Sequence, residues 1–228
     1  GRAAAVGRCE AMTRRAVITG VGVVAPGGVG RERFWELLTS GRTATRTITL
    51  FDPAGFRSKV AAECDFDPAA TGISSDQAAL LDRAAQFALV SAREAIADSG
   101  LAIEEIAPER VGVSIGSAVG CTTGLEREYV TISDGGSRWH VDHTKAVPHL
   151  YDYMVPSSLA VEVARDVAAE GPVALISTGC TSGLDSVGHG VQLVEDGRAD
   201  VVLAGATDAP LSPITAACFD AIRATSPN

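Results

Sequence analysis

From Pro172 to Gly183 the chain reads PVALISTGCTSG, an apolar run that passes directly into small and polar residues. The residues from 173 to 178 predict a short buried strand, and those from 181 to 195 predict a helix. Cys180 would then lie at the start of that helix, where the helix dipole favours a thiolate over a thiol. A thiolate held there is a nucleophile suited to attack a carbonyl carbon, so we predict an acyl-transfer site at Cys180.

The residues around Cys180 are all small, which would let a bulky acyl thioester reach the sulfur atom. The following helix contains Gly183, Gly188 and Gly190, each of which weakens a helix by roughly 1 kcal/mol relative to alanine. That cost is expected where a helix is buried between layers and other backbone approaches it closely. A free cysteine is more often a buried structural residue, but this setting favours a nucleophile.

Strand and helix patterns alternate along the rest of the chain. Apolar runs predict strands at 15–24, 111–115 and 200–206 besides 173–178, the last strand being 200–206, and a short extended piece at 60–64. Helical spacing predicts helices at 33–38, 76–99, 122–133, 156–168 and 181–195, with a polar loop at 134–150. Near-continuous apolar strands between helices indicate an α/β fold with a mostly parallel sheet covered on both faces. We expect a disordered leader at residues 1–11 and one folded unit at 12–228.

Composition excludes several classes of protein. The 228 residues carry a net charge of −9, which argues against binding to nucleic acid. No run approaches the roughly 18 apolar residues of a membrane span. The five cysteines are odd in number and form no Cys-x-x-Cys pair, which indicates a reducing cytoplasm and not a disulfide framework.

The segment STGCTSGLDSVG, residues 177–188, resembles the active-site segment of the β-ketoacyl synthases. It is similar above all to the ketosynthase-alpha subunits of bacterial type II (aromatic) polyketide synthases, because fatty-acid enzymes more often have alanine where Gly179 stands. In that family the paired chain-length factor lacks the cysteine, so Cys180 indicates the catalytic subunit. Supporting matches occur at residues 17–22, 34–41, 115–119, 153–157 and 199–205.

The resemblance implies a thiolase-like fold of two similar halves, of which this chain matches the N-terminal half. The natural protein is therefore expected to be about twice as long, with the decarboxylation histidines in its second half. Cys180 would accept an acyl chain, and its N–H would contribute to an oxyanion hole. Condensation with malonyl-carrier protein would follow, although this half alone would be inactive in that step. No cofactor or metal is expected, since substrates arrive on the phosphopantetheine arm of a carrier protein.

Three further residues are candidates on weaker grounds. Val119 matches a position that lines the acyl pocket in related synthases, although a plain core role is the simpler interpretation. Arg57 and Lys59 are candidates for docking an acidic carrier protein, because such docking needs a local basic patch. The alternative for both is an ordinary solvated charge.

The expected partners are an acyl carrier protein and a chain-length-factor-like subunit, or a second copy of this chain in a homodimer. The resemblance implies dimerisation through the sheet edge near residues 173–178. Two other functions stay open: a fatty-acid-type ketosynthase or a thiolase acting on coenzyme A esters, and a non-catalytic structural subunit or fragment. A lone half would also expose an apolar face.

Other motifs have simpler explanations. The segment GVGVVA at 20–25 fits a dinucleotide fingerprint, but the Pro-Gly-Gly that follows favours a turn at the end of a strand. His140, His143 and His149 are more consistent with a polar loop than with a metal site. His189 is expected to be a satisfied core histidine, with a supporting role near Cys180 as the alternative.

Overall fold

The computed structural model describes residues 14–227. A three-stranded parallel sheet lies at its centre, in the order β6 (Val173–Ile176), β5 (Val111–Gly116) and β7 (Val201–Ala206). Every residue of β5 is buried, and Ile115 lies opposite Leu175 on one side and Gly205 on the other. The predicted parallel sheet is therefore confirmed, with the most deeply buried strand in the middle.

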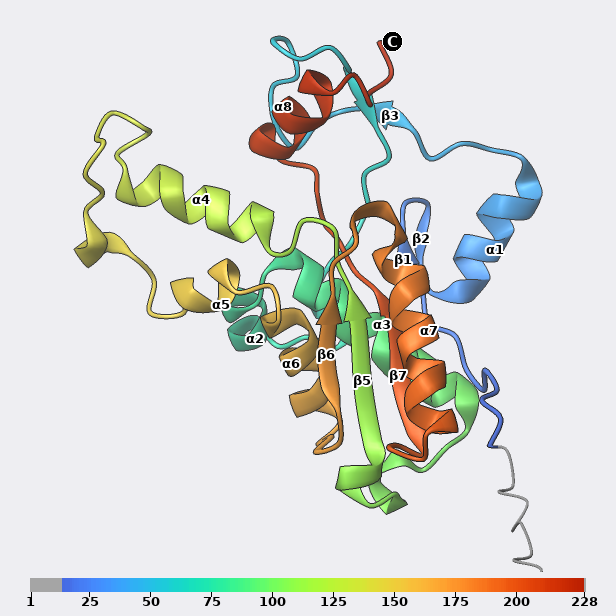
Figure 1. Cartoon of the computed structure of the whole chain (residues 1–228). Helices are drawn as coiled ribbons and strands as arrows, with labels where there is room; N and C mark the ends of the chain where they lie inside the picture. Colours follow the sequence, from blue (N-terminus) through green and yellow to red (C-terminus); the bar gives the residue numbers. More distant parts are fainter. Residues whose placement is uncertain (1–13, 228) are drawn as a thin grey trace, which may run out of the picture.

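Helices cover both faces of this sheet (Figure 1). One face carries α7 (Ser182–Glu195), and the other carries α6 (Ser158–Asp166) with α3 (Arg83–Ser99) packed behind it. A side chain at Gly116 would overlap the backbone of Ser182, and a Cβ at Gly190 would lie 2.9 Å from the Cβ of Ala204. Glycine at these positions therefore permits the close approach of α7 that its sequence predicted.

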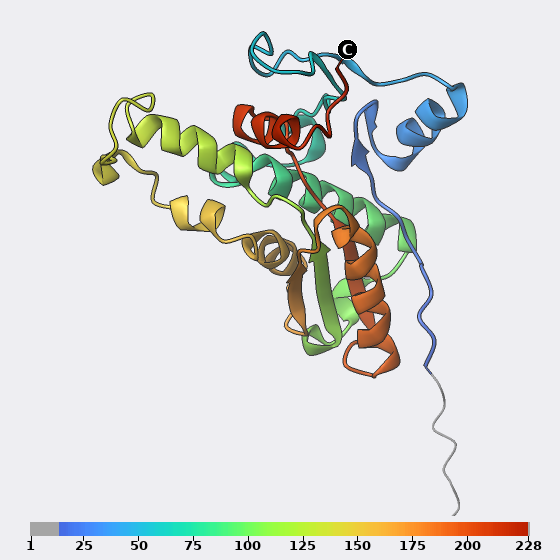
Figure 2. The same ribbon diagram turned by 45° about the horizontal axis from the view of Figure 1, so that its top comes forward.

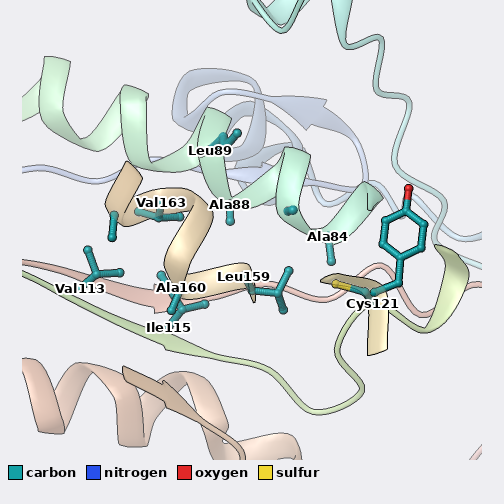
Figure 3. Close-up of a cluster of buried hydrophobic side chains, with 12 residues drawn as sticks. Ala84, Ala88, Leu89, Val113, Ile115, Cys121, Leu159, Ala160 and Val163 are labelled. Carbon is teal, nitrogen blue, oxygen red and sulfur yellow. The ribbon is translucent and has the colours of Figure 1, made fainter. Parts of the chain in front are cut away.

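The main core lies between α3, α6 and β5 (Figure 3). Small side chains on α3 let it approach α6 closely, and burying each large aliphatic side chain contributes about 1.5–3 kcal/mol. The labelled members of this cluster are Ala84, Ala88, Leu89, Val113, Ile115, Cys121, Leu159, Ala160 and Val163.

The remaining elements surround this centre, and α4 and α5 project from its body (Figure 2). Their bounds are β1 (Val24–Ala25), β2 (Gly28–Val29), α1 (Arg31–Ser40), β3 (Arg46–Thr47), β4 (Val60–Ala61), α2 (Ser75–Leu80), α4 (Thr122–Ile132), α5 (Leu150–Met154) and α8 (Pro213–Ala221). The helices predicted at 33–38, 122–133 and 156–168 are confirmed as α1, α4 and α6, with small shifts at their ends. The expected leader at residues 1–11 lies outside the described residues.

The helix predicted over 76–99 is two helices, because Asp82 caps the second one. Its carboxylate accepts the N–H of Ala84 at 2.8 Å and the N–H of Gly124 at 2.7 Å. The first bond ends one helix and starts the next, and the second bond ties α3 to α4. Burial raises the pKa of Asp82 despite these bonds. A further helix, α8, follows the strand predicted to be the last, with Ser212 as its N-cap and Pro213 in its first turn.

The strand predicted at 15–24 is wrong. Residues 14–23 run extended without a strand partner, and only Val24 and Ala25 enter a short hairpin. Carboxylates of α3 take the place of a neighbouring strand: Asp98 accepts the N–H of Val21 at 2.9 Å, and Glu94 accepts that of Val23 at 2.7 Å.

The two glycines of the GVGVVA motif, Gly20 and Gly22, permit the close contact between this segment and α3. A Cβ at Gly20 or Gly22 would overlap backbone carbonyl oxygens of α3. The motif leads into the β1–β2 hairpin and not into a helix, so it lacks the helix N-terminus that binds a dinucleotide pyrophosphate.

We predict that Gly22→Ala separates this segment from α3. The added methyl group overlaps Ser91 O, so the free energy of unfolding should fall by about 1–3 kcal/mol in urea titrations. Hydrogen exchange at the amides of Val21 and Val23 should accelerate. Gly55→Ala is the matched control, because its Cβ meets no atom within 4 Å, and it should change stability by less than about 0.5 kcal/mol. Unchanged exchange in Gly22→Ala would contradict the packing described.

Candidate active site

Cys180 lies where the chain passes from β6 to α7, in a single 3-10 turn that spans Gly179–Thr181. Its side chain is exposed and its thiol is free. Gly179 has a φ of 73°, and a Cβ there would meet no atom within 4 Å. The turn therefore requires glycine for its left-handed backbone and not for space. This position is at the carboxyl edge of the parallel sheet, where the ends of β5 and β7 also lie (Figure 1).

Ser182 is the buried centre of this turn. Its hydroxyl accepts the N–H of Thr178 at 3.0 Å and lies 2.6 Å from the carbonyl oxygen of Gly179. The same hydroxyl lies 3.3 Å from the carbonyl oxygen of Ser117, at the end of β5. Its single proton is shared between these two acceptors. Ser182 thus closes the turn around Cys180 and also ties it to the neighbouring strand.

Two threonines flank Cys180 and share one carboxylate. Thr178 donates its hydroxyl hydrogen to Asp185, and the Thr181 hydroxyl lies 3.3 Å from the same carboxylate oxygen. Local sequence predicts both threonines only as small neighbours of Cys180, and it does not single out Asp185. The available signal was the placement of Asp185 in the first turn of the helix, where a carboxylate can cap residues that precede it.

Val119 lies at the same edge of the sheet, in the turn that follows β5. It is half-buried. Its N–H donates to the carboxylate of Asp208 at 3.1 Å, and Asp208 also accepts from Ala118 N at 2.9 Å and Ser117 Oγ at 2.8 Å. The resemblance predicts Val119 at an acyl pocket, whereas no local pattern singles out Asp208. The carboxyl ends of β5 and β7 bring the two residues together, and the pocket role of Val119 stays a prediction.

Arg57 and Lys59 lie in the loop between β3 and β4, beside α8 (Figure 1). Lys59 Nζ lies 2.5–2.6 Å from the carbonyl oxygens of Pro53, Ala54 and Phe56, so its three donors close its own loop. Arg57 is exposed and donates to the carbonyl oxygen of Thr225 at 2.9 Å. A docking role for either residue stays a prediction.

Two of the histidines, His149 and His189, have hydrogen-bond partners within the fold. His189 Nδ1 lies 3.1 Å from the hydroxyl of Ser114 in β5, so its ring has a partner, although the residue is half-buried and not part of the core. His149 Nε2 lies 2.9 Å from the hydroxyl of Tyr153. Among residues 14–227, no group of three His, Cys, Asp or Glu side chains is placed to hold a metal ion. No helix in that range is both long and apolar enough to cross a membrane.

The cysteines differ sharply in their surroundings. Cys121 is buried 3.8 Å from the hydroxyl of Ser158, and burial raises the pKa of its thiol to about 12. We predict that iodoacetamide at pH 8 labels exposed Cys180 and leaves Cys121 unlabelled. At that pH Cys121 would hold about 1,000-fold less thiolate than a thiol with the ordinary pKa of 9.0. Peptide mass spectrometry reports both sites, and equal labelling would contradict the burial of Cys121.

We predict that Ser182→Ala loosens the turn that holds Cys180. Its loss leaves Thr178 N without its acceptor, which should lower the free energy of unfolding by about 1–3 kcal/mol. Alkylation of Cys180 should slow about two- to fivefold as the aligned amides at the helix start are lost.

Ser186→Ala is the matched control, because this hydroxyl is equally buried, one turn further along α7. It bonds to Gly183 O at 2.8 Å and Gly205 O at 2.6 Å, away from the Cys180 turn. It should lose similar stability and alkylate at the wild-type rate. Equal alkylation rates in both variants would show that Ser182 does not hold the Cys180 turn.

Comparisons with known proteins identify the family of this chain. Residues 13–228 match the family model of the β-ketoacyl synthase N-terminal domain. The ketoacyl synthase alpha subunit of the tetracenomycin polyketide synthase of Streptomyces glaucescens is 65% identical over 215 residues, which cover 94% of this chain and 50% of that protein. The chain thus spans about half the length of the curated relatives it matches.

Two solved structures share the fold. One contains a type II polyketide synthase acyl carrier protein in complex with its ketosynthase bound to the hexaketide. It has a TM-score of 0.80 at 33% identity, over 95% of this chain and 50% of that one. The other is the ishigamide ketosynthase/chain length factor, with a TM-score of 0.79 at 28% identity, over 95% of this chain and 52% of that one. With an exposed cysteine at the start of α7 and a family model that matches nearly its whole length, the chain belongs to the β-ketoacyl synthases.

Proposed function

We propose that the natural protein containing this chain is a β-ketoacyl-[acyl carrier protein] synthase of polyketide biosynthesis, with Cys180 as its nucleophile. The observation that supports this most directly is the exposed thiol of Cys180 in a glycine-dependent turn at the start of α7. The relative with 65% identity is a ketosynthase alpha subunit, which favours the polyketide branch.

The first step would load the acyl chain. The Cys180 thiolate attacks the thioester carbonyl of an acyl group carried on phosphopantetheine, and the carbonyl oxygen becomes an oxyanion. The amide groups at the start of the Gly179–Thr181 turn have no acceptor within the turn, so the Cys180 N–H is available to stabilise that charge. The carrier thiolate then leaves, and the acyl chain remains on Cys180 as a thioester.

The second step would extend the chain by two carbons. Malonyl-carrier protein loses CO₂, and the electron pair of the broken C–C bond forms an enolate. The enolate carbon attacks the Cys180 thioester carbonyl, and the C–S bond to Cys180 breaks to release the thiolate. By resemblance, the histidines that promote decarboxylation belong to the second half of the family fold, so this step requires more than the residues present here. Both substrates arrive on the carrier arm, and the proposal requires no bound cofactor.

The proposed partners are an acyl carrier protein and a chain-length-factor-like subunit. The solved structures at TM-scores of 0.80 and 0.79 include a carrier protein with its ketosynthase and a ketosynthase/chain length factor. Within the described residues β6 pairs only with β5, so its outer edge is open to another strand. A hollow of about 360 Å³ beside this edge is lined by apolar side chains, including those of Val161, Ala164 and Val173. We place the reaction in the cytoplasm.

The other functions differ in the substrate that acylates Cys180. A thiolase would accept a coenzyme A ester, and a structural subunit would accept neither thioester. An apolar row on α7, formed by Leu184, Val187 and Val191, is exposed, as expected for a half of the family fold.

Intact mass spectrometry of the natural protein tests the proposal. Incubation with an acyl-carrier-protein thioester should add one acyl group, and Cys180→Ala should abolish the adduct. Cys218→Ala is the matched control, because Cys218 is also an exposed free thiol, and this variant should acylate normally. Acylation by coenzyme A esters alone would indicate a thiolase. Absence of any adduct would exclude Cys180 as the nucleophile.

A further inference from the structure

The carboxylate of Asp208 accepts three hydrogen bonds from a single turn. It lies two residues beyond the end of β7, and its carboxylate accepts from three consecutive residues that follow β5. One oxygen accepts from Ser117 Oγ at 2.8 Å and Val119 N at 3.1 Å, and the other accepts from Ala118 N at 2.9 Å. Hydrogen bonds to an ionised carboxylate are about twice as strong as neutral ones, so this turn has a well-defined conformation.

The backbone next to Asp208 is held in place by hydrogen bonds to two other elements. The preceding residue, Thr207, is buried, and its N–H donates to the carbonyl oxygen of Gly116 at 2.9 Å. The Thr207 hydroxyl donates to the carbonyl oxygen of Ala84 in α3 at 2.6 Å. Because Thr207 is bonded to β5 and to α3, the neighbouring Asp208 carboxylate holds the Val119 turn in a fixed position relative to both elements.

The same turn is joined to the nucleophile. Ser117 is buried, its hydroxyl accepts the N–H of Gly120 at 2.8 Å, and its carbonyl oxygen lies 3.3 Å from the hydroxyl of Ser182. Ser182 in turn bonds to both residues that precede Cys180. One continuous set of hydrogen bonds thus runs from Asp208 through the turn at 117–120 to the Cys180 turn.

The hydrophobic core does not require the hydrogen bonds between Asp208 and this turn. Ala118 is exposed and Val119 is half-buried, so water could satisfy both amides without a carboxylate. The carboxylate instead fixes a surface turn beside the reactive thiol.

We propose that Asp208 is a positioning residue that holds the Val119 turn at a set place relative to Cys180, and so permits loading of long acyl chains. This inference rests on the proposed function. A short acyl group would need no contact with the turn, whereas a long chain that follows the pocket predicted at Val119 would gain from a preformed path.

The test measures the rate of Cys180 acylation in the natural protein with two carrier-protein thioesters, an acetyl group and a twelve-carbon acyl group. Asp208→Ala should lower the ratio of long-chain to acetyl rate by at least about tenfold, as expected when a guiding surface moves by about 1 Å. Asp208→Asn should lower it as well, because an amide nitrogen would face the Ala118 N–H. Alkylation of Cys180 by iodoacetamide should stay at the wild-type rate.

Asp200→Ala is the matched control. Asp200 lies at the opposite end of β7, where it pairs with Arg14 at 2.8 Å and Arg110 at 2.7 Å, and its loss should leave the ratio unchanged. Ser117→Ala provides a second test should Asp208→Ala fold poorly, since it removes one donor to the carboxylate and should lower the ratio in the same direction. An unchanged or higher ratio in these variants, or equal loss with both thioesters, would overturn the role of Asp208. No acylation of the wild type by either thioester would instead overturn the proposed function.

Discussion

The close contact between α7 and the sheet places Cys180 beside the turn that follows β5. Glycine at position 116 lets the backbone of Ser182 sit directly against the end of β5, and glycine at 190 lets α7 lie against β7. With a side chain at either position the helix would move outwards, and the Ser182 hydroxyl would lose the carbonyl oxygen of Ser117, 3.3 Å away. The position of Cys180 therefore depends on the absence of a side chain at Gly116 and Gly190, which lets α7 lie close to the sheet.

Much of this arrangement could be predicted from local sequence. The strands that form the sheet are short apolar runs, and their buried, parallel packing follows from that pattern. Cys180 was identifiable because one segment contains a strand end, a run of small residues and a helix start in immediate succession. Each of these features has a signature within a few residues, so local sequence suffices to predict it.

Other features depend on contacts that local patterns do not contain. The carboxylate of Asp208 and the turn at 117–119 are about ninety residues apart, and no spacing rule connects them. The apolar residues at 15–24 have a strand-like composition, but Asp98 and Glu94 on α3 satisfy their backbone instead. In the same way, the helical pattern from 76 to 99 continues through Asp82, although that side chain ends one helix and caps another.

The network around Cys180 is built without the cysteine side chain. Within residues 14–227, the hydrogen bonds that hold this turn come from Thr178, Thr181, Ser182 and Asp185, and none involves the Cys180 thiol. The proposed nucleophile and the residues that hold its turn are thus different residues. A copy of this chain that lost Cys180 would keep all of these hydrogen bonds, so a single substitution could remove the proposed nucleophile and leave the turn intact.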